Sequence, residues 1–144
     1  MEAKKKEQGI IKLTDNTILK LKITIVDIKE IGFSPFGGVN LSVNSVGGIA
    51  TYSVPEELRN AIVDKPSFPS GDLPHDGWEI VDIVEQEPAI EEEIIDTSKG
   101  KFRVRVVAEA VMAARNMNYR SVLNEPVYWV NWVWKVSWKP IEAK

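Results

Sequence analysis

The stretch Val127-Tyr128-Trp129-Val130-Asn131-Trp132-Val133-Trp134-Lys135-Val136-Ser137-Trp138 decides the fold. Its even-numbered residues are apolar or aromatic, whereas its odd-numbered residues are mixed and include Asn131, Lys135 and Ser137. Side chains alternate between two faces only in an extended strand, and aromatic and β-branched residues favour strands. Pro140 cannot donate to a sheet hydrogen bond and ends the pattern. The stretch is therefore predicted to be a long strand, central in its sheet.

Similar alternation before this stretch predicts more strands. The pattern recurs over residues 18–25, 39–43 and 101–106 and is predicted to continue through 107–115, although the alanines there also suit a helix. Residues 78–85 form another apolar strand. Gly47-Gly48 is interpreted as a two-residue hairpin turn, and Gly100 as the end of a hairpin turn starting at Thr97.

One helix is expected, over residues 54–63. Ser53 and Glu56 have the spacing of a capping box, and Pro66 prevents further extension. About eight strands with a single helix predict a mostly β fold, either an antiparallel barrel or a sandwich. We expect residues 1–8 to be a flexible basic tail and residues 9–144 to be a single domain.

Composition narrows the classes of function. The chain of 144 residues has no cysteine and one histidine, His75, which excludes thiolate catalysis and Cys or multi-His metal sites within the chain. Glu91, Glu92 and Glu93 are consecutive in a predicted strand, so they alternate between faces and do not converge on a metal ion. We find no catalytic motif and expect no enzyme activity, cofactor or metal.

The same composition bears on location. No apolar run reaches the length of a membrane span, and residues 1–8 lack a signal-peptide core. We therefore expect a cytoplasmic protein without membrane contact. The absence of cysteine and the scarcity of glutamine favour a thermophilic source.

Charge is distributed unevenly along the chain. Residues 99–144 hold nine basic and three acidic residues, whereas residues 32–98 hold two basic and thirteen acidic ones. One interpretation is that the C-terminal third contacts single-stranded DNA or RNA through cations and stacking aromatics. The candidate residues are Arg103, Arg105, Arg115, Tyr119, Arg120, Trp129, Lys135 and Lys139.

Structural interpretations compete with this one. Arg103 and Arg105 are expected opposite Glu91, Glu93 and their neighbours and are neutralised there if ion pairs form. Trp132, Trp134 and Trp138 are assigned to the core or to an oligomer interface, because burying a tryptophan contributes up to ~5 kcal/mol. Phe33 and Phe36 lie in a glycine-rich loop. One interpretation is an aromatic loop that faces a ligand; we favour the alternative, in which both rings are buried in the core.

The alternative function is a structural or protein-interaction module. It would assemble through the tryptophan-rich strand or the Pro/Gly loop at 64–77, either with itself as a homo-oligomer or within a larger complex. The exposure of Trp129 and the ion pairing of Arg103 and Arg105 are the features that discriminate between the two functions.

Overall fold

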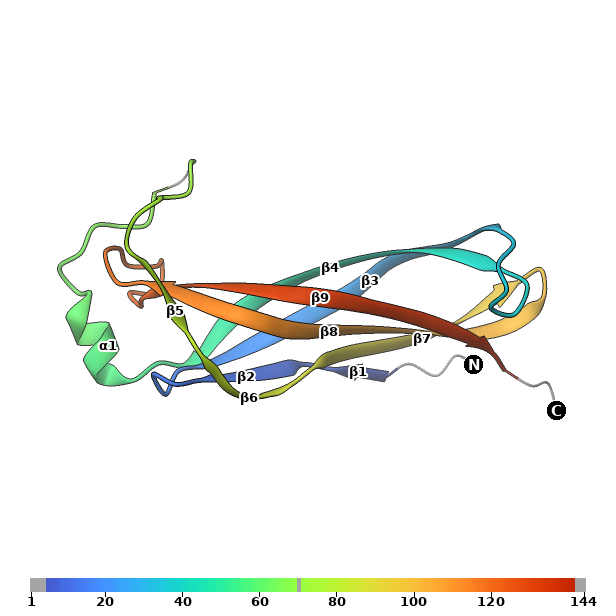
Figure 1. The fold of residues 1–144 in the computed structure, drawn as a ribbon, viewed down its shortest axis with the longest axis horizontal. Coiled ribbons are helices and arrows are strands. Elements are labelled where there is room, and N and C mark those ends of the chain that lie inside the picture. The colour runs from blue at the N-terminus through green and yellow to red at the C-terminus, as the bar shows by residue number, and fades with distance from the viewer. Residues whose placement is uncertain (1–4, 70, 142–144) are drawn as a thin grey trace.

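The computed structural model describes residues 5–69 and 71–141, which form two antiparallel sheets packed into an elongated sandwich (Figure 1). In one sheet β7 (Ala89–Thr97) and β5 (Trp78–Val81) pair with successive parts of β8 (Gly100–Asn116). On the outside of that sheet β1 (Lys5–Glu7) pairs with β7, and β9 (Val127–Pro140) pairs with the other side of β8. The second sheet has the order β4 (Asn40–Ser53), β3 (Ile18–Gly32), β2 (Gly9–Leu13) and β6 (Ile83–Glu87). The predicted mostly β sandwich is confirmed; the alternative of a closed barrel is not found.

One long side of the sandwich is joined covalently. The chain passes from β1 to β2 through Gln8, from β5 to β6 through Asp82, and from β6 to β7 through Pro88, and each passage moves it to the opposite sheet. The strand expected over 78–85 is therefore two strands, broken at Asp82. Proline suits such a passage because it cannot donate to a ladder.

The other long side is open, and β9 and β4 border it. β9 pairs only with β8 among the described residues, so the expectation of a central tryptophan strand is wrong: β9 is an edge strand. Period-two alternation specifies the two faces of a strand and not its neighbours, so it does not distinguish an edge strand from a central one.

Gly47 and Gly48 lie within β4, paired with Ile23 and Lys22, so the turn expected there is wrong as well. A Cβ on Gly47 would lie 3.2 Å from the tip of the Trp134 ring, whereas a Cβ on Gly48 would meet nothing within 4 Å. Gly47 therefore makes room for an indole that reaches it from the other sheet. The hairpin connection instead lies between β3 and β4, in the loop that contains Phe33 and Phe36.

The tryptophans of β9 lie at the margin of the core. Trp132 packs against the main cluster between the sheets, and Trp138 packs against a smaller cluster of Val39, Leu41, Phe102 and Val104. Trp134 is 39% exposed and makes an edge-to-face contact with Trp132. The expected core role is therefore met only in part: the three indoles line the open side of the sandwich.

The remaining predictions concern single elements. The helix is present as α1 (Glu56–Ala61), but it is shorter than expected, and its N-cap is Pro55 without a side-chain hydrogen bond, so the capping box does not form. Residues 107–115 continue β8 as a strand, as predicted. Residues 5–7 of the expected tail form β1, whereas residues 1–4 lie outside the described residues.

A buried carboxylate on β7 fixes which face its neighbours occupy. The register of β3 against β4 shifts between Ile25 and Asp27, and the backbone N–H of Ile25 donates to Glu91 Oε1 at 2.5 Å. Lys6 Nζ lies 3.5 Å from the other oxygen of this carboxylate. Because Glu91 points between the sheets, Glu92 points to the outer face, beside the cations of β8.

Candidate anion-binding site

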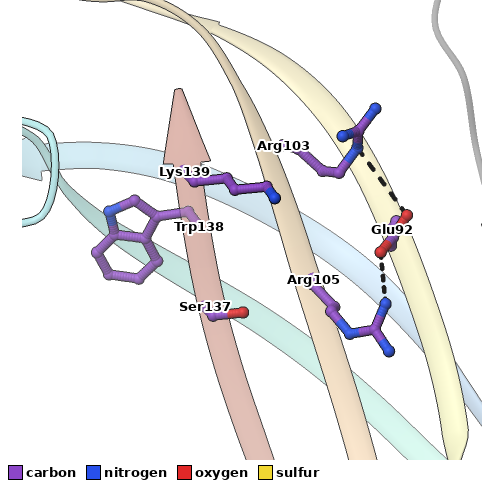
Figure 2. A pocket seen from close by; sticks show the side chains of 6 residues that line it. All are labelled: Glu92, Arg103, Arg105, Ser137, Trp138 and Lys139. Carbon is purple, nitrogen blue, oxygen red and sulfur yellow. Dashed lines mark hydrogen bonds and ion pairs between the residues drawn. The ribbon is translucent and has the colours of Figure 1, made fainter. Parts of the chain in front are cut away.

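Three cations gather on the outer face of the first sheet, around an open cavity of about 320 Å³. Arg103 and Arg105 project from β8 and Lys139 projects from β9 on the same side (Figure 2). We call these three residues the cationic platform. Arg103 and Arg105 point outward because side chains alternate along β8: Phe102, Val104 and Val106 point inward and are fully buried.

One carboxylate forms ion pairs with both arginines of the platform. Glu92 Oε2 lies 2.6 Å from Arg105 Nη1, and Glu92 Oε1 lies 4.0 Å from Arg103 Nε. Both arginine side chains remain about two-fifths exposed, at 39% and 40%. The predicted cross-strand neutralisation is therefore present, but it comes from Glu92 and not from Glu91 or Glu93, and it is incomplete.

The pairing of β8 with β9 places two like charges side by side. Arg103 lies directly opposite Lys139, and among the described residues Lys139 has no recorded ion pair. Like charges at directly opposed positions of an antiparallel pair destabilise the sheet. A bound anion between these side chains would remove that repulsion.

An aromatic loop borders the platform from the other side of β9. Phe36, in the β3–β4 loop, is 68% exposed and Phe33 is 78% exposed, so the expectation that both are buried is wrong. The indole N–H of Trp138 donates to the carbonyl oxygen of Phe36 at 3.2 Å, which attaches the loop to β9. In Figure 2 the Trp138 ring points away from the cations.

Arg115, another predicted site residue, lies toward the opposite end of β8, ten residues from Arg105, or roughly 33 Å along the strand. Its guanidinium donates to Glu79 Oε1 at 2.7 Å and to Asp15 Oδ2 at 2.8 Å, and its side chain is 20% exposed. Two carboxylates therefore neutralise this arginine. It tethers the β2–β3 turn to β8.

Asp15 is the centre of this network. It also accepts hydrogen bonds from the Tyr128 hydroxyl at 2.8 Å and from the backbone N–H of Thr17 at 2.9 Å. Burial alone would raise the pKa of Asp15, but these hydrogen bonds and the one from Arg115 outweigh it and hold the pKa below its usual value. Burial raises the pKa of the Tyr128 phenol, and its hydrogen bond to Asp15 raises it further.

Three more predicted residues have structural contacts near the same end. Arg120 donates to the carbonyl oxygen of Lys65 at 2.8 Å and to Asn124 Oδ1 at 3.1 Å, so it holds two loops together. Tyr119 and Trp129 are the outer members of a row of edge-to-face ring contacts. The row runs Tyr119, Phe68, Trp78, Trp129. Trp129 is 54% exposed at the end of this row.

Lys135, the last predicted residue, lies on β9 between the two ends. Its ammonium lies 2.8 Å from Glu109 Oε1, in an exposed ion pair. The structure thus brings Arg103, Arg105 and Lys139 together around one cavity, which none of the other five candidates lines. Lys135 is on the same face, two residues before the Ser137 that lies opposite Arg105, but its ammonium pairs with Glu109. Phe36 and Trp138, at the border of the platform, were not among the predicted site residues. Gly32, Gly37 and Gly38, on either side of the segment that contains Phe33 and Phe36, are the sequence signal of an exposed loop.

No family model, curated protein or solved structure matches this chain. Within residues 5–69 and 71–141, no helix is long and apolar enough to cross a membrane. No group of three or more His, Asp or Glu side chains suited to a metal ion is found in the same residues.

Proposed function

We propose that the protein binds single-stranded DNA or RNA, with backbone phosphates on the cationic platform. The observation that carries the proposal is the opposed pair Arg103 and Lys139, next to Arg105, with Glu92 as the one carboxylate in ion-pair range of the two arginines among the described residues. Arginine suits phosphate oxygens because its planar N–H groups donate in pairs. Binding is local, since the whole chain has a net charge of −3.

The test is a titration of tryptophan fluorescence with oligo-dT and oligo-U at several salt concentrations. Three phosphate contacts give a slope of about −2 in a plot of log affinity against log salt concentration, at about −0.7 per contact on single strands. Unchanged emission together with unchanged anisotropy of a labelled oligonucleotide at low salt would overturn the proposal.

A pair of matched variants locates the site. Lys139→Gln removes a cation of the platform. Lys135→Gln removes a cation on the same face of β9, four residues before Lys139, that already pairs with Glu109. We expect Lys139→Gln to weaken oligo-dT binding and to lower the salt slope by about 0.7, the value of one lost contact. Lys135→Gln is expected to leave both nearly unchanged, and equal losses would contradict the assigned site.

A second function, self-assembly, has one specific observation in its favour: the free edge of β9. This strand is 14 residues long and pairs on one side only among the described residues, and Val133 at its middle is 43% exposed. A free edge carries unpaired N–H and C=O groups that pair with another strand. The matching occupant is β9 of a second copy, running antiparallel about a two-fold axis.

Sedimentation velocity over a range of concentrations tests this second function. Self-assembly predicts a dimer for the native chain and a monomer for Val133→Lys, because charged residues on an edge strand oppose pairing. Val111→Lys is the control, since Val111 is 54% exposed at the bulge of β8 and lies one strand away from the free edge of β9. A native chain that remains monomeric at high concentration would exclude self-assembly through β9.

A further inference from the structure

The neighbourhood of Trp138 contains a second cavity next to that of the platform. This cavity, of about 180 Å³, is lined by Phe36, Val136, Ser137 and Trp138. Ser137 and Trp138 also line the platform cavity. The two cavities therefore meet at the same two residues of β9, one on the outer face and the other on the open side of the sandwich.

We propose that one nucleotide of the bound strand crosses the free edge of β9, with its phosphate on the platform and its base stacked against Phe36 and Trp138. The inference rests on the proposed function and specifies how the same site holds a base. This arrangement makes the site bind a nucleic-acid strand more tightly than a polyanion that has no bases.

The edge position of β9 makes this crossing short. Strands in a sheet lie about 4.8 Å apart, so a ligand that reaches round a single edge strand spans about 5 Å. A central strand would have a neighbour in the way. The free backbone groups of the edge also offer donors and acceptors to the polar rim of a base.

The aromatic side of the site is preorganised. Gly37 has a positive φ of 82°, and a Cβ there would lie 2.7 Å from the Phe102 ring, so the loop packs closely on a fully buried side chain. Ser34 Oγ donates to the carbonyl oxygen of Val39 across the loop. Together with the hydrogen bond from the Trp138 indole to the Phe36 carbonyl oxygen, these contacts fix the backbone of the loop beside the indole. A loop backbone that is already ordered loses little conformational entropy when a base binds against it.

The chemistry of the two cavities is complementary. The platform cavity is surrounded by charged side chains, whereas Phe36, Val136 and Trp138 form most of the wall of the second cavity. Base stacking on aromatic rings tolerates any sequence, because every base has a π face. We therefore expect binding without strong base preference.

The loop supplies a matched pair of variants for the test. Phe36→Ala removes a ring that lines the second cavity, whereas Phe33→Ala removes a similarly exposed ring, three residues earlier, that does not line it. Each is titrated with labelled oligo-dT and with an abasic oligomer of equal length, which keeps the phosphates and lacks the bases. Circular dichroism verifies that both variants are folded.

We expect the native chain to bind oligo-dT about tenfold more tightly than the abasic oligomer, within the range of one base stacked on an aromatic residue. Phe36→Ala is expected to remove most of that difference, with abasic binding unchanged, and Phe33→Ala to preserve it. Equal affinity of the native chain for the two oligomers, or equal losses in both variants, would overturn the inference.

The outcomes separate this inference from the proposed function. If both oligomers bind equally and Lys139→Gln weakens both, phosphate binding on the platform stands and base stacking fails. If neither oligomer binds at low salt, the proposed function fails and this inference fails with it.

Discussion

The two ends of the β8–β9 hairpin carry the same kinds of side chain in different states. Toward one end Arg115 is held by two carboxylates and its side chain is 20% exposed. Toward the other end Arg103 and Arg105 share Glu92, and Lys139 adds a third cation. A pattern of arginines and tryptophans therefore does not define a binding surface by itself. The ratio of cations to carboxylates within reach distinguishes the two ends.

The largest expected effect tests the neutralised end. Arg115→Ala should lower the free energy of unfolding by about 2–3 kcal/mol, because it leaves the largely buried Asp15 without its cation. Arg105→Ala should lower it by less than about 1 kcal/mol, as is usual for exposed ion pairs. Urea unfolding of the two variants measures the contrast, and equal losses would contradict it.

A second prediction extends the comparison to the open side between the two ends. Gly47→Leu should lower the free energy of unfolding by about 2 kcal/mol, since the new side chain meets the Trp134 ring, Ile23 and the Lys22 carbonyl oxygen. Gly48→Leu is the control, because nothing lies within 4 Å of its Cβ position. If both variants unfold at the same urea concentration as the native chain, Trp134 does not close this side.

A third prediction sharpens the neutralised end through pH. The folded-state pKa of Asp15 is below the ordinary 3.8, so the stability it contributes is present above pH 3.8 and is lost as the pH falls through the folded-state value. The difference in unfolding free energy between the native chain and Asp15→Asn should therefore shrink as the pH is lowered from 5 to 2. A constant difference over that range would show that the charge of Asp15 does not stabilise the folded chain.

The smallest expected effect tests the platform end. Glu92→Gln removes the carboxylate shared by the two arginines and should strengthen oligo-dT binding several-fold, with a change in stability below about 1 kcal/mol. Glu79→Gln, near the neutralised end, should leave binding unchanged. Weaker binding in Glu92→Gln would mean that this carboxylate orients the arginines and does not compete with the anion.

These contrasts also show what the sequence alone specifies. Alternation predicts the two faces of a long strand, because the buried face is identified by residues close together in the sequence, as at Phe102, Val104 and Val106. It did not show that β9 is an edge, that Gly47 faces an indole, or that Arg115 is paired, because each depends on distant chain. Asp15 lies 100 residues from Arg115 in the sequence. Phe36 was expected to be buried for a different reason: phenylalanine side chains are usually buried, so burial was favoured over an exposed loop.

The passages of the chain between sheets at Asp82 and Pro88 have a consequence for folding. Residues 78–97 supply strands to both sheets, and β1 and β2 do the same from the N-terminal side. Neither sheet can be completed until these segments, some 80 residues apart, have met. High contact order of this kind slows folding to milliseconds or seconds. It also couples the sheets, so tryptophans at both ends of β9 should report one unfolding transition with one midpoint.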